Sequence, residues 1–301
     1  MYNKLDNICE KLALKYLKNE PMCKYTSFKI GGNADRFIEI NTKSQLSEIL
    51  LHIKKESLPF FILGNGSNLL VSDKGIRAVV LSLKGDFKKI ELLENNVIRC
   101  GAGLMLSSLC NFAKDNSLSG LEFAFGIPGT AGGATYMNAG AYGGEMKDVV
   151  IKSEHFIDAN FGSFCSDELD FSYRHSAYSD KNYIITDIYL KLEKADKSEI
   201  EEKMQELMLA RKTKQPLEFP SAGSTFKRPV GYFAAALIEE CGLKGFSLGG
   251  AQVSEKHSGF VINKGGATCK DVLDLANEIK KIVAEKKNVV LETEIKMIGE
   301  K

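Results

Sequence analysis

Apolar residues recur along the chain at spacings that predict alternating helices and strands. Between residues 5 and 16 they fall every three or four positions, which predicts a helix. Residues 27–40 are expected to form two strands joined by a Gly-Gly turn. Thr42 and Gln45 are spaced as a capping box before the apolar face of residues 46–53, which predicts the start of a second helix.

The middle of the chain continues this alternation and then interrupts it. The expected elements are strands at 59–64 and 78–83, a hairpin around 94–96, a helix over 106–113 and a strand over 182–192. The segment from Gly126 to Gly144 is so rich in glycine and alanine that neither a helix nor a strand is expected there. We therefore expect the backbone of this stretch to have a specific role, such as close approach to a ligand.

A change of composition after residue 192 indicates a domain boundary. Residues 193–215 are highly charged and predict an amphipathic helix, so we place the boundary near Glu193, between domains 1–193 and 194–301. The rest of the second domain is expected to hold helices at 230–238 and 272–282 and strands at 259–263 and 288–299.

Composition narrows the possible partners and the compartment. The 301 residues are 44% hydrophobic and 26% charged, and 40 Lys and Arg balance 39 Asp and Glu, so neither disorder nor binding to nucleic acid or a membrane is expected. The seven cysteines form no C-x-x-C pair, which favours reduced thiols. The N-terminal segment is charged throughout and no apolar run is long enough to span a bilayer, so we expect a cytoplasmic protein.

Two glycine clusters are candidates for binding phosphate through the backbone. The first, GNGSNL at 64–69, follows an apolar strand, and the second runs from Gly126 to Gly144. Two anion-binding loops suit a diphosphate, although plain turns remain the alternative, more strongly for the first loop. No Lys-Ser or Lys-Thr follows Gly66, and the Rossmann spacing is absent, so other common nucleotide motifs do not fit.

Seven motifs, in one order along nearly the whole chain, resemble those of the UDP-N-acetylenolpyruvoylglucosamine reductase family (UDP-N-acetylmuramate dehydrogenases). They lie at 26–35, 64–70, 126–145, 173–176, 221–229, 242–263 and 291–299. The interval from Arg174 to Ser224 is short, which indicates the shorter family type without an inserted lid subdomain. How the substrate pocket closes without that subdomain is left open.

The resemblance implies an α+β fold, with an FAD-binding domain of the vanillyl-alcohol-oxidase-like type and a smaller α+β substrate-binding domain. It implies non-covalent FAD, NADPH as the reductant, and reduction of UDP-N-acetylglucosamine enolpyruvate to UDP-N-acetylmuramate for peptidoglycan synthesis. The substrate is a small nucleotide sugar, and we expect a monomer. The rivals are another flavoenzyme of the same superfamily and a non-catalytic nucleotide-binding module, which would be colourless.

Three residues match the family's catalytic positions. Arg174 would bind the substrate carboxylate, since a guanidinium can do so bidentately. Ser224 would donate a proton, and Glu294 would act as a second acid that stabilises the enolate-like charge. From the residues alone, a surface arginine, a turn serine and a solvated glutamate are the simpler interpretations. Alternation cannot choose between Glu292 and Glu294, and the family motif selects Glu294.

The resemblance also assigns binding residues. FAD is expected to contact Gly64, Asn65, Gly66, Ser67, Asn68, Leu69, Gly126, Ile127, Pro128, Gly129, Thr130, Gly132, Gly133, Asn138 and Gly140. Lys214 matches a lysine that contacts the substrate diphosphate, and Tyr173 and Arg228 are further substrate-binding candidates. No set of His, Cys, Asp or Glu has metal-ligand spacing, so no metal is expected.

Overall fold

The chain forms two compact units, each assembled from separate segments. The computed structural model describes residues 2–157, 160–179 and 181–300. The first unit comprises Met1–Leu17, Arg36–Gly64 and Ala78–Arg211, and the second comprises Lys18–Asp35, Asn65–Arg77 and Lys212–Lys301. The predicted single boundary at Glu193 does not describe these units. The assignment of 1–193 to FAD and 194–301 to the substrate stays a prediction about ligands.

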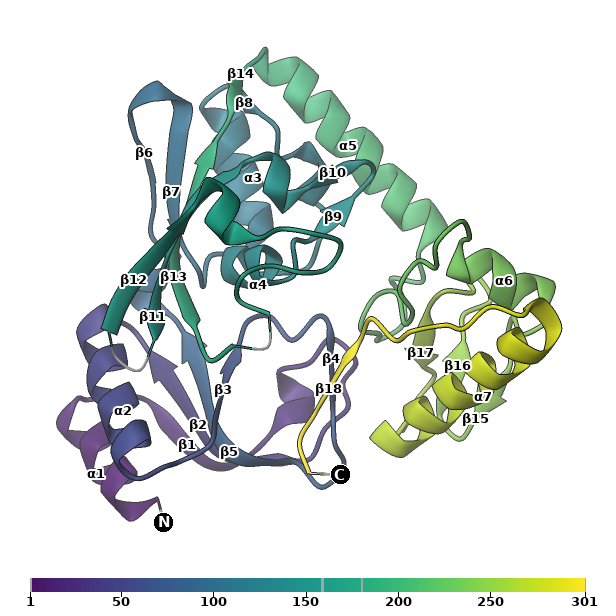
Figure 1. The fold of residues 1–301 in the computed structure, drawn as a ribbon, viewed down its shortest axis with the longest axis horizontal. Coiled ribbons are helices and arrows are strands. Elements are labelled where there is room, and N and C mark those ends of the chain that lie inside the picture. Colours follow the sequence, from purple (N-terminus) through teal and green to yellow (C-terminus); the bar gives the residue numbers. More distant parts are fainter. Residues whose placement is uncertain (1, 158–159, 180, 301) are drawn as a thin grey trace. The chain divides into compact units, whose positions relative to one another are not determined.

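Two sheets are built mainly from residues of the first unit (Figure 1), although residues 18–21 of β1, 33–35 of β2 and 76–77 of β5 are assigned to the second. One has the strand order β1-β2-β5-β3, from Tyr16–Pro21, Asn33–Ile40, Ile76–Leu83 and Phe60–Leu63, with β3 and β5 parallel. The other has the order β12-β11-β13-β7-β6, from Asn160–Cys165, Val150–Ile157, Ile184–Lys191, Val97–Gly101 and Ile90–Leu92, and is antiparallel. Short pairs are β8–β14 (Leu118–Ser119, Glu193–Lys194) and β9–β10 (Gly140–Ala141, Gly144–Glu145).

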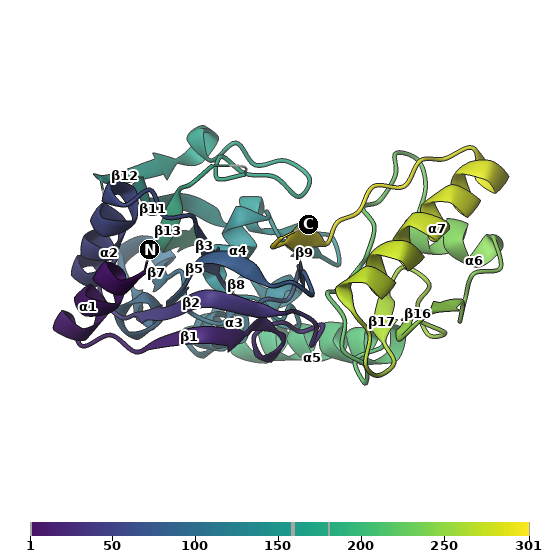
Figure 2. The same cartoon turned by 90° about the horizontal axis from the view of Figure 1, so that it is seen from below.

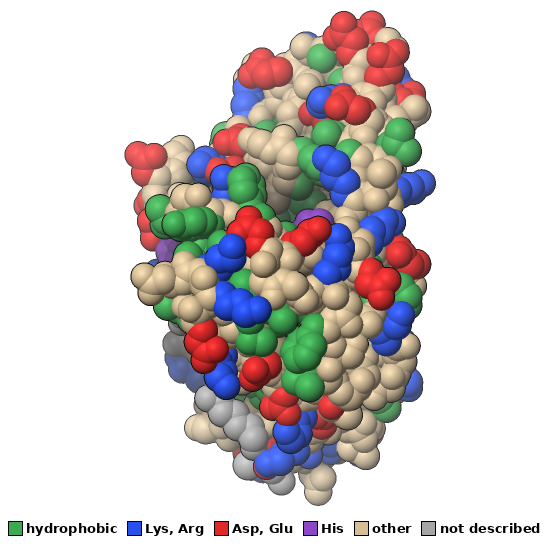
Figure 3. Space-filling view, turned by 90° about the vertical axis from the view of Figure 1, so that its right-hand side faces the viewer, with side chains coloured by type: hydrophobic (Ala, Val, Ile, Leu, Met, Phe, Trp, Pro, Cys, Tyr) green, Lys and Arg blue, Asp and Glu red, His purple; other side chains and the backbone are tan. Residues whose placement is uncertain are grey.

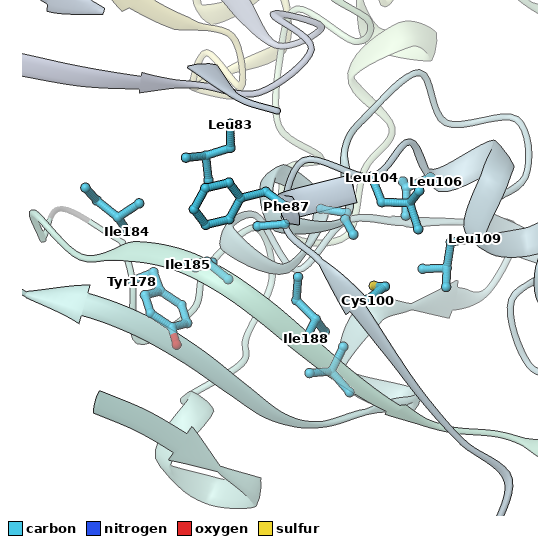
Figure 4. Packing of buried hydrophobic residues seen from close by; sticks show 14 of the residues in the cluster. Leu83, Phe87, Cys100, Leu104, Leu106, Leu109, Tyr178, Ile184, Ile185 and Ile188 are labelled. Carbon is cyan, nitrogen blue, oxygen red and sulfur yellow. The ribbon is translucent and has the colours of Figure 1, made fainter. Parts of the chain in front are cut away.

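Helices cover these sheets and complete one hydrophobic core. They are α1 (Asn3–Lys11), α2 (Lys43–Lys55), α3 (Leu106–Asp115), α4 (Ala131–Tyr136) and α5 (Lys197–Lys214). Helix α2 begins with the predicted capping box of Thr42 and Gln45, and it lies beside α1. Figure 4 shows side chains from β5, β7, β13 and α3 meeting in the core, where each fully buried apolar side chain contributes about 1.5–3 kcal/mol.

The second unit has its own core, between a small sheet and two helices. The sheet has the order β15-β16-β17, from Ser247–Leu248, Ala251–Val253 and Val261–Asn263. Helices α6 (Ala234–Glu240) and α7 (Cys269–Lys287) pack with it (Figure 2). Strand β4 (Leu69–Val71) pairs in parallel with β18 (Lys296–Ile298).

Long-range contacts explain why residues 65–77 belong to this unit. The Asp73 carboxylate accepts hydrogen bonds from the backbone N–H groups of Cys269 (2.8 Å) and Lys270 (3.1 Å) at the start of α7. It therefore satisfies N–H groups that the helix itself leaves unpaired. A segment from the first quarter of the chain thus stabilises a helix near its end.

The N-terminal predictions were wrong in two places, and local turns give the reason. The first helix ends at Lys11 because Ala13 has a left-handed backbone (φ 50°), and Tyr16 begins strand β1 instead. Residues 27–32 form a turn and not a strand, since the Thr26 hydroxyl donates to the carbonyl of Ile30 (2.9 Å). Only the second predicted strand, β2, is present.

Three later expectations also need correction. The glycine-rich stretch contains helix α4, capped by the Thr130 hydroxyl, which accepts a hydrogen bond from Gly133 N (3.2 Å). Helix α6 starts only at Ala234, because Gly231 has a left-handed backbone (φ 77°) that interrupts a helix, and Val230 is 98% exposed. The final strand covers only Lys296–Ile298, since residues 292–294 pair with the 225–227 segment around the isolated bridge Phe226–Thr293.

The surface mixes both signs of charge. Figure 3 shows lysine, arginine, aspartate and glutamate side chains interspersed over the face in view, in keeping with the balanced composition. Within the described residues, no helix combines the length and apolar character that a membrane span requires. In the same part of the chain, no three His, Cys, Asp or Glu side chains are grouped so that they could hold a metal ion.

Candidate active site

A tight turn in the first unit presents Arg174. Ser172 and His175 exchange two backbone hydrogen bonds (3.2 and 3.1 Å), so Tyr173 and Arg174 form the tip of the turn. Arg174 has φ 56°, a conformation that non-glycine residues adopt rarely and at a cost. Its guanidinium carbon lies 5.1 Å from the centroid of the Tyr173 ring, a cation–π contact.

The buried side chain of Asn138 supports this turn from the glycine-rich stretch. Its amide nitrogen donates to the carbonyl of Ser172 (3.0 Å) and to the Glu145 carboxylate (2.7 Å), and its oxygen accepts from Lys147 N (2.9 Å). The side chain is therefore fully used within the protein. We expect the predicted FAD contact of Asn138 to come from its backbone.

Most backbone donors around α4 are also used within the first unit. The N–H groups of Ile127, Gly129, Ala131, Gly132 and Gly133 all have acceptors in the protein. A Cβ atom on Gly132 would lie 2.7 Å from the Cβ of Ala102, which shows why the residue is glycine. In this stretch small residues allow close packing, so a ligand here would meet a compact backbone surface more than a row of free N–H groups.

The first glycine loop, in contrast, offers unused donors. Gly66 has φ 63°, and a Cβ atom there would lie 2.0 Å from the carbonyl oxygen of Tyr25, so only glycine fits. Among the described residues, the N–H groups of Gly66 and Ser67 have no hydrogen-bond acceptor. Because buried backbone N–H groups are almost always paired, these two are suited to an anionic ligand.

The same loop leads directly to Glu294 in the second unit. The amide nitrogen of Asn68 donates to the carbonyl of Glu294 (3.2 Å), and the carbonyl of Asn68 accepts from Lys296 N (2.9 Å). Strand β4 then continues the pairing with β18. A residue predicted to bind FAD therefore holds the backbone of a residue predicted to be catalytic.

Ser224 and Glu294 lie on neighbouring chain segments of the second unit. The bridge Phe226–Thr293 joins these segments in antiparallel fashion, and Glu294 N donates to the carbonyl of Thr225 (2.9 Å). Ser224 is exposed and Glu294 is half-buried. The structure thus brings two of the three predicted catalytic residues together within one unit.

The structure gives Glu292 and Glu294 different surroundings, a difference that the alternation of side chains along a strand could not predict. The Glu292 side chain is 71% exposed and forms an ion pair with Lys227 (3.1 Å) on the surface. Glu294 is less accessible and is held at both sides of its peptide, by Asn68 and by Thr225. These contacts favour Glu294 as the functional carboxyl.

The other two substrate-binding candidates are exposed residues of the second unit. Lys214 is the last residue of α5, and Arg228 places its guanidinium carbon 4.0 Å from the centroid of the Phe233 ring. Both cations are accessible to a ligand.

Sequence analysis missed Arg211, one helical turn before Lys214. The side chain is half-buried over Gly126, where an added Cβ would lie 2.9 Å from the Cδ atom of Arg211. Among the described residues its guanidinium has no hydrogen-bond or ion-pair partner, and burial lowers its pKa. The Arg-x-x-Lys spacing at the end of a predicted helix is the signal that could have drawn attention to it.

Comparison with known proteins assigns the family. A model of the C-terminal domain of UDP-N-acetylenolpyruvoylglucosamine reductase matches residues 215–298, and a model of an FAD binding domain matches residues 34–160. A UDP-N-acetylenolpyruvoylglucosamine reductase from Caldanaerobacter subterraneus is 51% identical over 302 residues, which cover 100% of this chain and 99% of the relative. The chain belongs to the UDP-N-acetylenolpyruvoylglucosamine reductase family.

Further reductases of this family agree with the assignment. The relative from Clostridioides difficile is 48% identical, with 100% of this chain and 98% of the relative covered. The crystal structure of the reductase from Thermus caldophilus matches with a TM-score of 0.81 at 38% identity, covering 95% of this chain and 98% of that one. The predicted resemblance is confirmed, and so is an α+β fold with an FAD-binding domain.

Proposed function

We propose that this chain catalyses the NADPH-dependent, FAD-mediated reduction of UDP-N-acetylglucosamine enolpyruvate to UDP-N-acetylmuramate, a step of peptidoglycan precursor synthesis. The observation that carries the proposal is 51% identity over the full chain to a reductase of that name. The enzyme acts on a small nucleotide sugar. We further propose that it works as a cytoplasmic monomer.

The residues present fit FAD, for two reasons that concern unused polar groups. Among the residues that the structure describes, the N–H groups of Gly66 and Ser67 have no acceptor and suit a diphosphate oxygen, and the guanidinium of Arg211 beside Gly126 has no partner and suits an anionic group. We propose that the glycine residues of 64–69 and 126–140 hold the cofactor non-covalently. When bound, FAD accepts a hydride from NADPH and supplies it to the substrate.

Arg174 is proposed to bind the substrate carboxylate. Hydride addition to the terminal methylene carbon of the enol ether leaves negative charge on the neighbouring carbon and its carboxylate. A guanidinium keeps its positive charge at any relevant pH and can bind both carboxylate oxygens. The turn of residues 172–175 fixes the backbone of Arg174, and the guanidinium contacts the Tyr173 ring, which would limit the reorganisation needed when the charge develops.

Ser224 and Glu294 are proposed to complete the reduction. The Ser224 hydroxyl donates its proton to the carbon that bears the carboxylate, which forms the new C–H bond and completes the saturated lactyl ether. Glu294, when protonated, donates a hydrogen bond to the enolate-like oxygen. An alcohol is a weak acid, so this step depends on the strong basicity of the enolate and on accurate placement of the hydroxyl.

Lys214, Tyr173 and Arg228 are proposed to bind the rest of the substrate. Lys214 and Arg228 are exposed cations that could each meet a phosphate oxygen of the UDP group. Tyr173 lies beside Arg174 at the tip of the turn and would limit how far the guanidinium can move.

The test measures the two half-reactions, flavin reduction and flavin reoxidation, separately in the variant Ser224→Ala. The rate of flavin reduction by NADPH should stay within about twofold of wild type, whereas reoxidation by the enolpyruvyl nucleotide should slow by about 100-fold or more. Stopped-flow absorbance near 450 nm measures both rates. Equal slowing of the two halves would contradict the proton-donor role. Reoxidation by oxygen but not by the nucleotide in wild type would indicate a different flavoenzyme.

A further inference from the structure

Thr225, which follows the proposed proton donor, has all of its polar groups occupied. The side chain is fully buried. Its N–H donates to the carbonyl of Gly259 (2.8 Å), its carbonyl accepts from Glu294 N (2.9 Å), and its hydroxyl accepts from Val261 N (2.9 Å). Thr225 therefore joins three separate segments of the second unit.

These contacts fix the chain on the C-terminal side of Ser224. Before it, Gly223 has φ 77° with open space around it, so this position does not restrain the segment by packing. After it, Thr225 is held by the 259–261 segment through two hydrogen bonds. Thr225 therefore fixes the C-terminal side of Ser224, while the nearest backbone pairing on its N-terminal side is the bridge Ser221–Ile262.

The same residue also fixes Glu294. The hydrogen bond from Glu294 N to the carbonyl of Thr225 aligns the two segments one residue beyond the bridge Phe226–Thr293. A change in the seating of Thr225 would therefore shift the serine hydroxyl and the glutamate backbone together. The hydroxyl of Thr225 also satisfies the N–H of the buried Val261, which would otherwise lack a partner.

We propose that Thr225 is a positioning residue that sets Ser224 and Glu294 in register for protonation of the substrate. The inference rests on the proposed roles of those two residues. Thr225 itself touches neither substrate nor cofactor, since its side chain is fully buried and its polar atoms are engaged within the protein. The role requires the hydroxyl as an acceptor, not only the shape of the side chain.

The experiment compares two matched pairs at position 225. Thr225→Val keeps the shape but removes the acceptor, and Thr225→Ser keeps the acceptor; if Thr225→Val does not fold, Thr225→Ala against Thr225→Ser makes the same comparison. We expect the variant without a hydroxyl to slow flavin reoxidation by the enolpyruvyl nucleotide by about 10- to 100-fold, and the serine variant to stay near wild type. The rate of flavin reduction by NADPH and the FAD content should change by less than about twofold in either variant. The slower reoxidation is expected to arise only from displacement of Ser224 and Glu294.

Thr268→Val is the control for a merely structural effect. Thr268 caps helix α7 in the same unit, and its hydroxyl likewise accepts a backbone hydrogen bond, from Asp271 N (3.0 Å). This variant should lower the melting temperature and leave the ratio of the two half-reactions unchanged. If Thr225→Val behaves like Thr268→Val, the inference is overturned.

Ser224→Ala distinguishes this inference from the proposed function beneath it. If Ser224→Ala leaves reoxidation by the nucleotide unchanged, the proposed role of Ser224 fails, and with it the basis of the inference. If Ser224→Ala slows that step but Thr225→Val does not, only the inference fails. If both slow it, Thr225→Val should cost less in the Ser224→Ala background than in wild type, because the two changes act on one proton transfer. Independent, multiplicative losses would contradict positioning of Ser224.

Discussion

Single residues in the two glycine-rich segments have different physical reasons for being small. Gly66 has a left-handed backbone and no room for a Cβ atom beside Tyr25. Gly132 has an ordinary helical backbone in α4 and is small because it packs closely on Ala102. Gly129 has ordinary space, with Leu106 Cδ1 at 3.5 Å from an added Cβ. Substitutions at these positions therefore report on packing or on ligand binding, depending on the residue.

Gly132→Ala should lose stability even without a cofactor. The added methyl group would meet Ala102 at 2.7 Å, so backbone must shift, and overpacking of this kind costs about 1–3 kcal/mol. Chemical denaturation of the apoprotein measures the loss. Gly129→Ala is the control and should unfold near the wild-type midpoint; an equal loss in both variants would contradict the packing role of Gly132.

Arg211→Met should weaken FAD binding without destabilising the fold. The guanidinium is half-buried beside Gly126 and unpaired within the described residues, so its removal relieves a desolvation cost while retaining apolar contacts. We expect less flavin retained after gel filtration and an apoprotein melting temperature that is equal or higher. Lys212→Met changes an exposed neighbouring cation and should retain FAD as wild type does. Unchanged retention in Arg211→Met would remove Arg211 from the cofactor site.

At the scale of elements, buried polar side chains join β11 to the segment before β13. His155 of β11 has its Nδ1 atom 3.0 Å from the Tyr178 hydroxyl, which also hydrogen-bonds the hydroxyl of Ser153. The His155 ring stacks on Tyr183 with centroids 5.0 Å apart. Ser153, His155 and Tyr178 are all buried, so a positive charge on the His155 ring would be poorly solvated.

The free energy of unfolding should fall as the pH is lowered through the usual range of histidine. Burial lowers the pKa of His155 below its ordinary value of 6.5, and the pKa of His257 shifts the same way. The unfolded chain therefore takes up protons first, and stability that is fully present above pH 6.5 is lost as the pH falls below it. Urea denaturation at a series of pH values measures this. In His155→Phe the free energy of unfolding should fall less steeply as the pH is lowered, and the fall that is left should come from His257. The same slope in both proteins would contradict the assignment.

At the scale of the whole molecule, the predicted FAD contacts are divided between the two units. Gly64 and residues 126–140 belong to the first unit, and residues 65–69 belong to the second. Each group of predicted contacts can therefore be tested within its own unit.

Amide hydrogen exchange with and without FAD tests this division. Saturating FAD should slow exchange in the glycine-rich stretch of the first unit and in residues 65–69 of the second, since a ligand that binds only the folded form suppresses local opening. Helix α2 lies outside both predicted loops and serves as an internal reference. Protection confined to one unit would show that the contacts predicted in the other are wrong.

Local signals in the sequence were enough for many of the elements. The capping box of Thr42 and Gln45, the apolar face after it and the hairpin around Asn95 were predicted correctly, because each depends on neighbours in the chain. The motif order identified the family and its cofactor-binding domain. Predictions failed where a residue with a left-handed backbone ended or delayed an element, as at Ala13 and Gly231.

The sequence alone determined the family, the fold class and the residue types available for chemistry. Only the tertiary structure decided which of these residues meet. Glu294 and not Glu292 is held by Asn68 and Thr225, and Asn138 supports the turn of Arg174. Arg211 has no partner in the described part of the chain. The physical reason is sequence distance. Hydrogen bonds join segments up to 235 residues apart, and such pairs leave no periodic pattern in the sequence.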